Sequence, residues 1–439
     1  MLDLRYRSIL GMALPLMAST FIQSIVLITD SSFLSRYDTI AFDAVGNGGL
    51  IYITCFMAIV GLSDGAQILM ARRIGENKES KLARIFGTTL FANALISIAL
   101  ILLIMFVIPH IITSYANNQE IASGQIDYLN IRAYSLLFAV ISLTINAYLM
   151  AIGKTTIVFI SAIFIAISNI GLDYLLIFGT DTIPQMGLKG AALASTMSDG
   201  IGMIFLLVAL ALSKHQKLFT ELSYNFESLK ELIRIGSPIA LQGVVALLTW
   251  TIFFTWIEQM GEYELTISQT IRSLYFLAFV PVWGFGATTK TYVSQYLGKG
   301  DLIQVKTIIK RIQLLSLIFL FIFFHGAILY PEQLISLINP NELYMKDSVE
   351  VLRFTTGAVA LYSFGSIFFQ TINGSGNTKV TFYIELIAVF TYIISAYLLI
   401  KVFEVRIFWV WSVEYIYFIS IGLFSVIYLK NFKWQKIKT

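Results

Sequence analysis

The strongest constraint on the fold is a succession of apolar runs, each long enough to cross a bilayer as a helix. Hydrophobic residues make up 57% of the 439 residues and charged residues only 13%, whereas soluble domains carry about 25% charged residues. A spanning helix needs ~20 apolar residues. The runs are continuous and lack the alternation of strands, so we predict an all-α membrane protein. The twelve predicted spans are 8–34, 43–71, 84–109, 125–151, 156–178, 188–212, 231–257, 266–296, 312–330, 350–373, 380–400 and 407–429.

The two halves of the chain repeat one another at an offset of 223 residues. Six spans in each half is an even number, so both halves have the same orientation and form a parallel repeat. We predict two six-helix lobes, 1–213 and 229–439, joined by an amphipathic inner connector, 214–228. The residues that match across the offset without a gap are Pro15 and Pro238, Gly61 and Gly284, Gly75 and Gly298, Gly153 and Gly376, and Thr155 and Thr378.

Positive charge predicts the orientation. With the N-terminus inside, most of the 30 Lys and Arg residues fall on the inner side, which is the usual bias of membrane proteins. We therefore expect a multi-pass, monomeric protein of the inner (plasma) membrane with both termini cytoplasmic. The sequence pI of 8.8 follows from this bias and requires no nucleic-acid partner. The single cysteine, Cys55, excludes an internal disulfide.

A group of polar residues near the outer ends of spans in the first half predicts a cation site. Asp30, Asp173 and Ser195 lie roughly 6–11 Å below the outer surface, judged by distance from the helix ends. Asn169 precedes Asp173 by four residues and shares its helix face, while Tyr128 has a similar depth. Carboxylates inside a membrane are functional by default, and this oxygen set suits a small cation or a shared proton. The alternative is that both acids cap helix ends or face the outer interface.

The second half lacks these residues. The offset takes Asp30 to Phe253, Asn169 to Tyr392 and Asp173 to Ala396, so coupling through the first half alone is expected. Pro15 removes a backbone hydrogen bond within span 1, and its kink either takes part in conformational change or is a static packing feature shared with Pro238.

Other intramembrane residues are candidates for lining a substrate cavity, or for local pairing. Lys290 and Glu385 have matching depths and either form a buried pair or reach water separately. The three histidines are far apart and form no metal pattern, so we expect no metal beyond a possible Na+ at Asp30, Asn169 and Asp173. The sequence Gly153–Thr155 lacks the upstream glycine of a phosphate loop, so ATP is not expected as the energy source. The cavity candidates are Asp64, Asp199, Arg272, Lys290, Glu385 and Trp283.

Five segments resemble the multidrug and toxic compound extrusion (MATE) family, in order and spacing along essentially the whole chain. They are LPLMASTFIQSIVLITD (14–30), GLSDGAQILMARRIGENK (61–78), SNIGLDYLLIFG (168–179), MGLKGAALAST (186–196) and VPVWGFGATTKTYVSQYLGKGD (280–301). The resemblance places Asp30, Asn169 and Asp173, with Tyr128 and Ser195 alongside, at the cation site of the DinF-like branch. Ser195 stands where threonine is expected. The NorM-like branch carries acids in spans 7 and 10, whereas the corresponding stretches of this chain, SPIALQGVVALLTW (237–250) and SIFFQTINGSGN (366–377), contain no acid.

The resemblance implies a V-shaped fold of two lobes around a central cavity, and a mechanism of alternating access. It implies an antiporter coupled to H+, Na+ or both, which exports amphipathic, cationic organic compounds and contacts membrane lipid but needs no cofactor. Two alternatives stay open. One is a flippase for lipid-linked oligosaccharides of the same superfamily, which would be favoured by a basic cavity. The other is a membrane-embedded enzyme, although the sequence shows no catalytic cluster.

Overall fold

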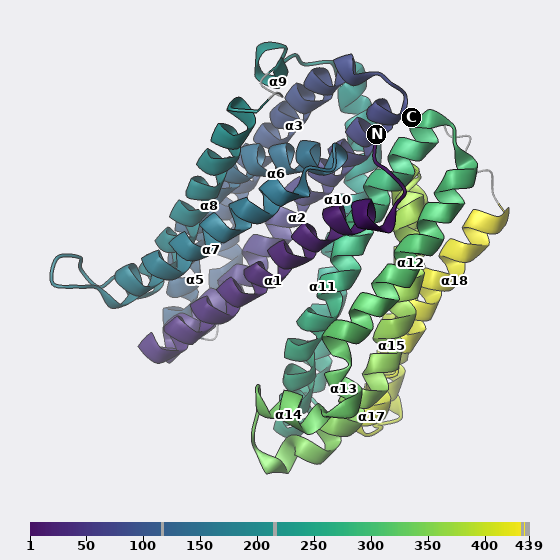
Figure 1. Ribbon diagram of the computed structural model, residues 1–439. Helices are drawn as coiled ribbons and strands as arrows, with labels where there is room; N and C mark the ends of the chain where they lie inside the picture. Colours follow the sequence, from purple (N-terminus) through teal and green to yellow (C-terminus); the bar gives the residue numbers. More distant parts are fainter. Residues whose placement is uncertain (116–117, 214–216, 432–433, 435–439) are drawn as a thin grey trace. The chain divides into compact units, whose positions relative to one another are not determined.

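The described part of the chain is helical, as predicted. The computed structural model describes residues 1–115, 118–213, 217–431 and 434; positions 116–117, 214–216, 432–433 and 435–439 lie outside it. Ten helices are long and apolar enough to cross a membrane, and two further helix pairs pass the same test together, which makes up to twelve spans. One of these pairs, Gln119–Arg132 with Ser135–Ala151, is bent by 48°. The described residues contain no strand, and the predicted fold class is confirmed (Figure 1).

Two compact units make up the structure. The N-terminal unit comprises Ala18–Arg73 and Asn77–Ala240, and the C-terminal unit comprises Met1–Met17, Ile74–Glu76 and Leu241–Thr439. The division falls inside three long helices: after Arg73 in α2, and two residues after Pro15 in α1 and Pro238 in α10. The predicted lobes, 1–213 and 229–439, are defined by the sequence repeat, whereas the two units are defined by contacts between residues. The lobes stay a prediction.

The described residues up to Glu258 contain ten helices. A 3-10 turn, Glu79–Lys81, precedes α3, and a π-helical turn, Leu103–Val107, joins α3 to α4. Within the predicted connector, 214–228, the described residues form the short α9 and the start of α10. The helices are α1 (Tyr6–Tyr37), α2 (Thr39–Gly75), α3 (Leu82–Leu102), α4 (Ile108–Tyr115), α5 (Gln119–Arg132), α6 (Ser135–Ala151), α7 (Thr155–Phe178), α8 (Gly187–Ala211), α9 (Lys217–Thr220) and α10 (Phe226–Glu258).

The described residues from Glu262 on contain eight further helices. The helix that contains most of the span predicted at 312–330 is α12, which starts ten residues earlier, at Leu302. Asp301 caps this start, because its side chain accepts a hydrogen bond from the backbone amide of Gln304 at 3.2 Å. The helices are α11 (Glu262–Lys299), α12 (Leu302–Phe324), α13 (Gly326–Leu329), α14 (Pro331–Ser336), α15 (Glu342–Gly374), α16 (Thr378–Tyr397), α17 (Ile407–Val410) and α18 (Val413–Asn431), with a π-helical turn at Leu398–Val402.

Close packing of α7 against α8 builds the centre of the N-terminal unit. A Cβ at Gly190 of α8 would lie 2.4 Å from the carbonyl oxygen of Leu176 on α7, so only glycine permits this approach. At Gly202, three turns further along α8, an added Cβ would lie 2.4 Å from Cγ1 of the Ile165 side chain on α7. Small residues at a crossing allow membrane helices to pack backbone to backbone. Polar side chains on the two helices are thereby brought within hydrogen-bonding range.

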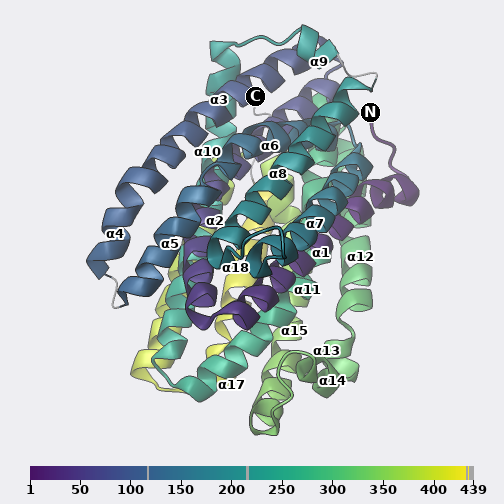
Figure 2. The same ribbon diagram turned by 90° about the vertical axis from the view of Figure 1, so that its left-hand side faces the viewer.

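An aromatic cluster fills the centre of the C-terminal unit. Helices α11, α12, α15 and α18 lie side by side in this unit (Figures 1 and 2). Trp411 is completely buried, and its indole nitrogen donates to the Ser268 hydroxyl at 3.2 Å. Phe253 packs edge-to-face against Tyr392, with ring centroids 5.3 Å apart, and against Trp411 at 5.7 Å. Such aromatic pairs stabilise a core beyond their burial alone.

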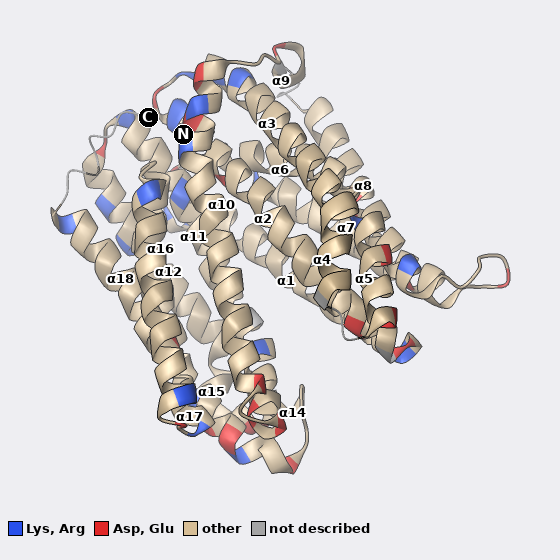
Figure 3. Ribbon diagram, turned by 180° about the vertical axis from the view of Figure 1, so that it is seen from behind, with Lys and Arg blue, Asp and Glu red and all other residues tan. Residues whose placement is uncertain are grey.

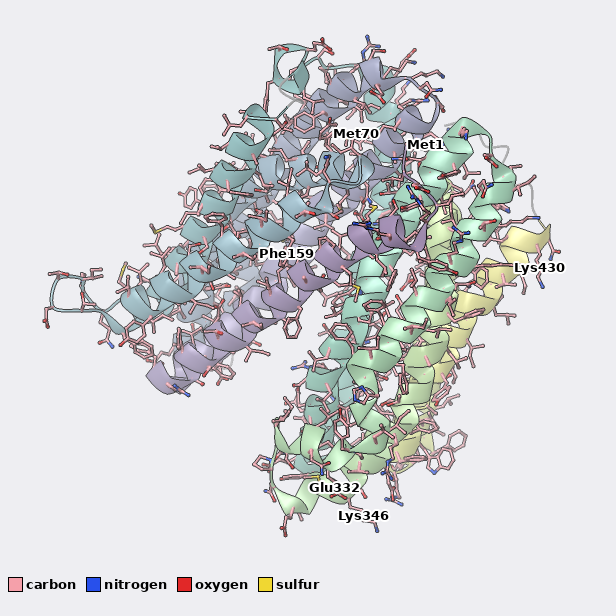
Figure 4. All side chains as sticks on the ribbon, viewed as in Figure 1. Met1, Met70, Phe159, Glu332, Lys346 and Lys430 are labelled. Atoms are coloured by element: carbon pink, nitrogen blue, oxygen red, sulfur yellow. The ribbon has the colours of Figure 1, made fainter. Side chains whose placement is uncertain are left out.

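Charged residues lie mostly towards helix ends. In Figure 3 the long middle stretches of the helices are almost free of Lys, Arg, Asp and Glu. Within the C-terminal unit, Glu332 and Lys346 lie at one end of the helices, and Lys430 lies towards the other (Figure 4). This is the distribution expected of helices whose middle segments contact hydrocarbon.

Candidate functional site

The polar residues predicted near the outer ends of the first-half spans come together in the N-terminal unit. Asn169 and Asp173 lie one turn apart on α7, with exposed fractions of 2% and 0%. The Asn169 amide nitrogen donates to the Ser195 hydroxyl of α8 at 3.3 Å. The carboxyl group of Asp30, on α1, lies within hydrogen-bonding reach of Asp173.

Several oxygen atoms of this group lack a hydrogen-bond partner. Among the described side chains, both carboxylate oxygens of Asp173, Oδ1 of Asp30 and Oδ1 of Asn169 are buried and unpartnered. Two carboxylate oxygens are both acceptors, so they bind one another only through a shared proton or a cation. Buried polar groups normally have partners, and leaving them without one is unfavourable. The arrangement is therefore suited to binding a proton or a small cation.

Tyr128 of α5 completes the predicted set. Its side chain is buried, with 8% exposed, and its hydroxyl interacts electrostatically with the charges of Asp30 and Arg132. All five predicted residues therefore lie within one unit and near one another. Their role in ion coupling stays a prediction.

Sequence reasoning named Asp199 as a cavity candidate but missed Arg132, which lies next to this group. The Arg132 side chain is only 12% exposed. It donates to Asp199 of α8 at 2.9 Å and to Ser135 at the start of α6 at 2.8 Å. Its guanidinium also lies 4.3 Å from the centre of the Tyr52 ring on α2. The spacing of four between Tyr128 and Arg132 is the signal that places both on one helix face.

At the corresponding positions of the second half, the structure has the aromatic cluster instead of a polar site. Phe253, Tyr392 and Ala396 are all buried in that cluster. Two acids are nevertheless buried beside it: Glu385 and Glu414, with 4% and 1% exposed. Glu414 accepts a hydrogen bond from Tyr392 at 3.0 Å, and Glu385 accepts one from Tyr417. The predicted pairing of Glu385 with Lys290 stays a prediction.

The remaining cavity candidates lie on several helices. Asp64 is half-buried on α2, and Lys290 is buried on α11 with 7% exposed. Arg272 of α11 lies 4.8 Å from the centre of the Phe254 ring. Trp283, also on α11, is 44% exposed and stacks on Phe279, with ring centroids 5.7 Å apart. The described residues contain no group of three or more His, Cys, Asp or Glu side chains that could hold a metal ion.

A comparison with protein families decides the classification. The sequence model of the MatE family matches the chain twice, at residues 15–175 and 238–398. The chain belongs to the MatE family. The two matches begin at positions 15 and 238 and end at 175 and 398, so both ends are offset by the same 223 residues as the repeat. Members of this family are secondary transporters and not enzymes, which holds for this multi-pass membrane protein also.

Individual MatE relatives cover nearly the whole chain. It is 24% identical to the "Probable multidrug resistance protein NorM" of Thermotoga maritima, over 98% of the chain and 93% of that protein. It is 21% identical to the "Probable multidrug resistance protein YoeA" of Bacillus subtilis, over 98% and 94%. Among solved structures, a mutant of the Vibrio cholerae MATE transporter VcmN has a TM-score of 0.86 at 17% identity, and 98% of each chain is covered. This last likeness shows the shared fold.

Proposed function

We propose that this MatE transporter is a cation-coupled antiporter that exports amphipathic organic cations by alternating access. The observation that carries the proposal is the pair of carboxyl groups of Asp30 and Asp173, within hydrogen-bonding reach, with three of their oxygens buried and unpartnered. A bound H+ or Na+ removes the repulsion between the two carboxylates and gives their oxygens a partner. Asn169 supplies a further oxygen, with Ser195 and Tyr128 beside it.

Two features support export of organic compounds. Relatives that match 98% of the chain carry names that describe multidrug resistance. The unit that holds the proposed ion site also holds a partly exposed carboxylate, Asp199, which can attract a cation. No cofactor is needed, since the ion gradient supplies the free energy. The other cavity candidates, Asp64, Arg272, Lys290, Glu385 and Trp283, are proposed to contact substrate along its path, and Pro15 to allow α1 to bend.

The positions of the second half that correspond to Asp30, Asn169 and Asp173 carry no acid, and this supports assignment to the DinF-like branch. The bias of Lys and Arg supports an inner (plasma) membrane protein with cytoplasmic termini, and we expect it to act as a monomer.

Transport in reconstituted vesicles tests the coupling. The purified protein is inserted into vesicles with ethidium as the organic cation, and a pH or Na+ gradient is imposed. We expect a gradient of at least one of the two ions to drive ethidium movement by the wild type. Asp30→Asn and Asp173→Asn should abolish the driven movement without preventing insertion, because each removes a charge that the coupling ion neutralises.

A matched control is Asp43→Asn, which makes the same chemical change at an exposed position of α2. This variant should transport like the wild type. Full gradient-driven transport by Asp30→Asn would refute the proposed coupling. Movement of a lipid-linked diphosphate sugar, with no movement of ethidium, would favour the flippase alternative.

A further inference from the structure

The charge of the Arg132 guanidinium acts on three carboxyl groups of the N-terminal unit. Arg132 is the last residue of α5, at the 48° bend that separates α5 from α6. In the structure it pairs with Asp199, at 2.9 Å. Its charge also acts on the carboxyl groups of Asp30 and Asp173. One cation is therefore close to two alternative anionic partners.

Both sides of the alternative pairing have unused hydrogen-bonding capacity. A guanidinium carries five N–H donors, and the Nε donor of Arg132 is buried without a partner. The carboxylate oxygens Oδ1 and Oδ2 of Asp173 and Oδ1 of Asp30 are buried acceptors without a partner. Arginine and carboxylate pair strongly when both are removed from water. The unused donor and acceptors therefore permit a second arrangement of the same residues.

Charge balance favours movement between the two arrangements. Three carboxyl groups interact with the charge of a single arginine, so a second positive charge is needed to neutralise the group more fully. A coupling cation at Asp30 and Asp173 supplies that charge and leaves Arg132 to Asp199. The titratable and charged groups that face one another here, among the described residues, are Asp30 on α1, Tyr52 on α2, Tyr128 and Arg132 on α5, Asp173 on α7 and Asp199 on α8.

We propose that Arg132 is a movable internal cation that makes ion binding and substrate binding mutually exclusive. This inference rests on the proposed function of Asp30 and Asp173. When the coupling ion occupies these acids, Arg132 pairs with Asp199, as in the structure. When the ion leaves, the guanidinium moves towards Asp30 and Asp173, and Asp199 binds an organic cation. Antiport requires such opposed occupancy, because a ligand shifts an equilibrium only through differential affinity.

The surroundings of Asp199 suit an aromatic or alkylated organic cation. The Asp199 side chain is 34% exposed, so its carboxylate is accessible while it remains paired with Arg132. The Tyr52 ring, on which the guanidinium lies, stacks on Phe56 with ring centroids 6.0 Å apart. A ring that binds a guanidinium by a cation–π contact offers the same face to another cation once the arginine has moved.

A double-mutant cycle tests the competition for Asp199. Binding of tetraphenylphosphonium to the full-length protein in lipid nanodiscs is measured at constant pH by titration calorimetry. Arg132→Gln should tighten binding about fivefold, since it removes the competing cation, and Arg132→Lys should stay within about twofold of the wild type. Asp199→Asn should weaken binding, and adding Arg132→Gln to that variant should change affinity by less than about twofold.

Two results would overturn the inference. One is unchanged or weaker binding in a folded Arg132→Gln protein. The other is unchanged binding in Asp199→Asn, which decides the matter even if Arg132→Gln does not fold.

The effect of the coupling ion separates this inference from the proposed function. Tetraphenylphosphonium binding is measured with and without Na+, replaced by N-methylglucamine, and at low and high pH. The wild type should bind more weakly when the coupling ion is present. Asp30→Asn and Arg132→Gln should both lose this effect, whereas Arg132→Lys should keep it. If Asp30→Asn loses it and Arg132→Gln keeps it, the role of Arg132 is wrong and the ion site stands. If Asp30→Asn keeps it, or the wild type shows none, the proposed function itself is wrong.

Discussion

The contact between α7 and α8 at Gly190 gives a quantitative test of how packing supports the site. In Gly190→Ala, the new Cβ would lie 2.4 Å from the Leu176 carbonyl oxygen, whereas real Cβ atoms essentially never come within 3.0 Å of a non-bonded heavy atom. That oxygen accepts the Met186 amide at 2.9 Å and cannot move without weakening this bond. The two helices must separate by at least 0.6 Å, the difference between 3.0 and 2.4 Å. Overpacking of this kind costs about 1–3 kcal/mol.

The separation should also affect the ion site. The Asn169–Ser195 hydrogen bond joins the same two helices and is already 3.3 Å long, so it should break when they move apart. We expect Gly190→Ala to lower the thermal unfolding midpoint in detergent and to reduce gradient-driven ethidium transport in vesicles. Unfolding is measured with a thiol-reactive dye, since the half-buried Cys55 is the only cysteine.

Gly171→Ala is the matched control for Gly190→Ala. Gly171 lies on α7, and a Cβ added there meets no atom within 4 Å. Because alanine is the better helix former, this variant should unfold at the wild-type temperature or slightly above it. A Gly190→Ala protein as stable as Gly171→Ala would show that the helices tolerate the added methyl group, and the packing argument would fail.

Two further predictions concern the C-terminal unit and the orientation of the chain. Tyr392→Phe removes the hydrogen bond to buried Glu414 and should destabilise the protein by about 1–3 kcal/mol. The control Tyr383→Phe, at a 62% exposed position of the same helix, should have no effect. Equal thermal unfolding midpoints for the two variants would contradict this prediction. In a variant without the natural cysteine, Lys346→Cys should react with a membrane-impermeant maleimide on intact cells, and Lys78→Cys only after permeabilisation; the reverse pattern would invert the proposed topology.

Much of the fold is predictable because the membrane imposes local rules. Every spanning segment must satisfy its backbone hydrogen bonds internally, so an apolar run of sufficient length predicts a helix without knowledge of its neighbours. Helix ends were less predictable: α12 begins at Leu302, although the apolar run that identified it begins near 312. A helix can extend beyond the bilayer with polar residues, such as those after the Asp301 cap, and hydropathy does not detect such extensions.

The candidate site was predictable in part for the same reason. The spacing of four between Asn169 and Asp173 places both on one face of any helix, whatever packs against it. The proximity of Asp30 to Asp173, however, depends on how α1 lies against α7, and spacing along the sequence carries no information about that. Depth alone suggested the grouping, and the structure supplied the contact.

The amino-acid sequence alone predicts the helical membrane fold, the repeat at 223 residues and the restriction of the Asp30–Asn169–Asp173 set to the first half. Each of these follows from local composition or from comparing one half with the other. The pairing of Arg132 with Asp199 is seen only in the folded chain. Arg132 ends α5 at a 48° bend, and its partner lies 67 residues away on α8. Electrostatic partners are chosen by proximity in space, which only the packing of helices sets.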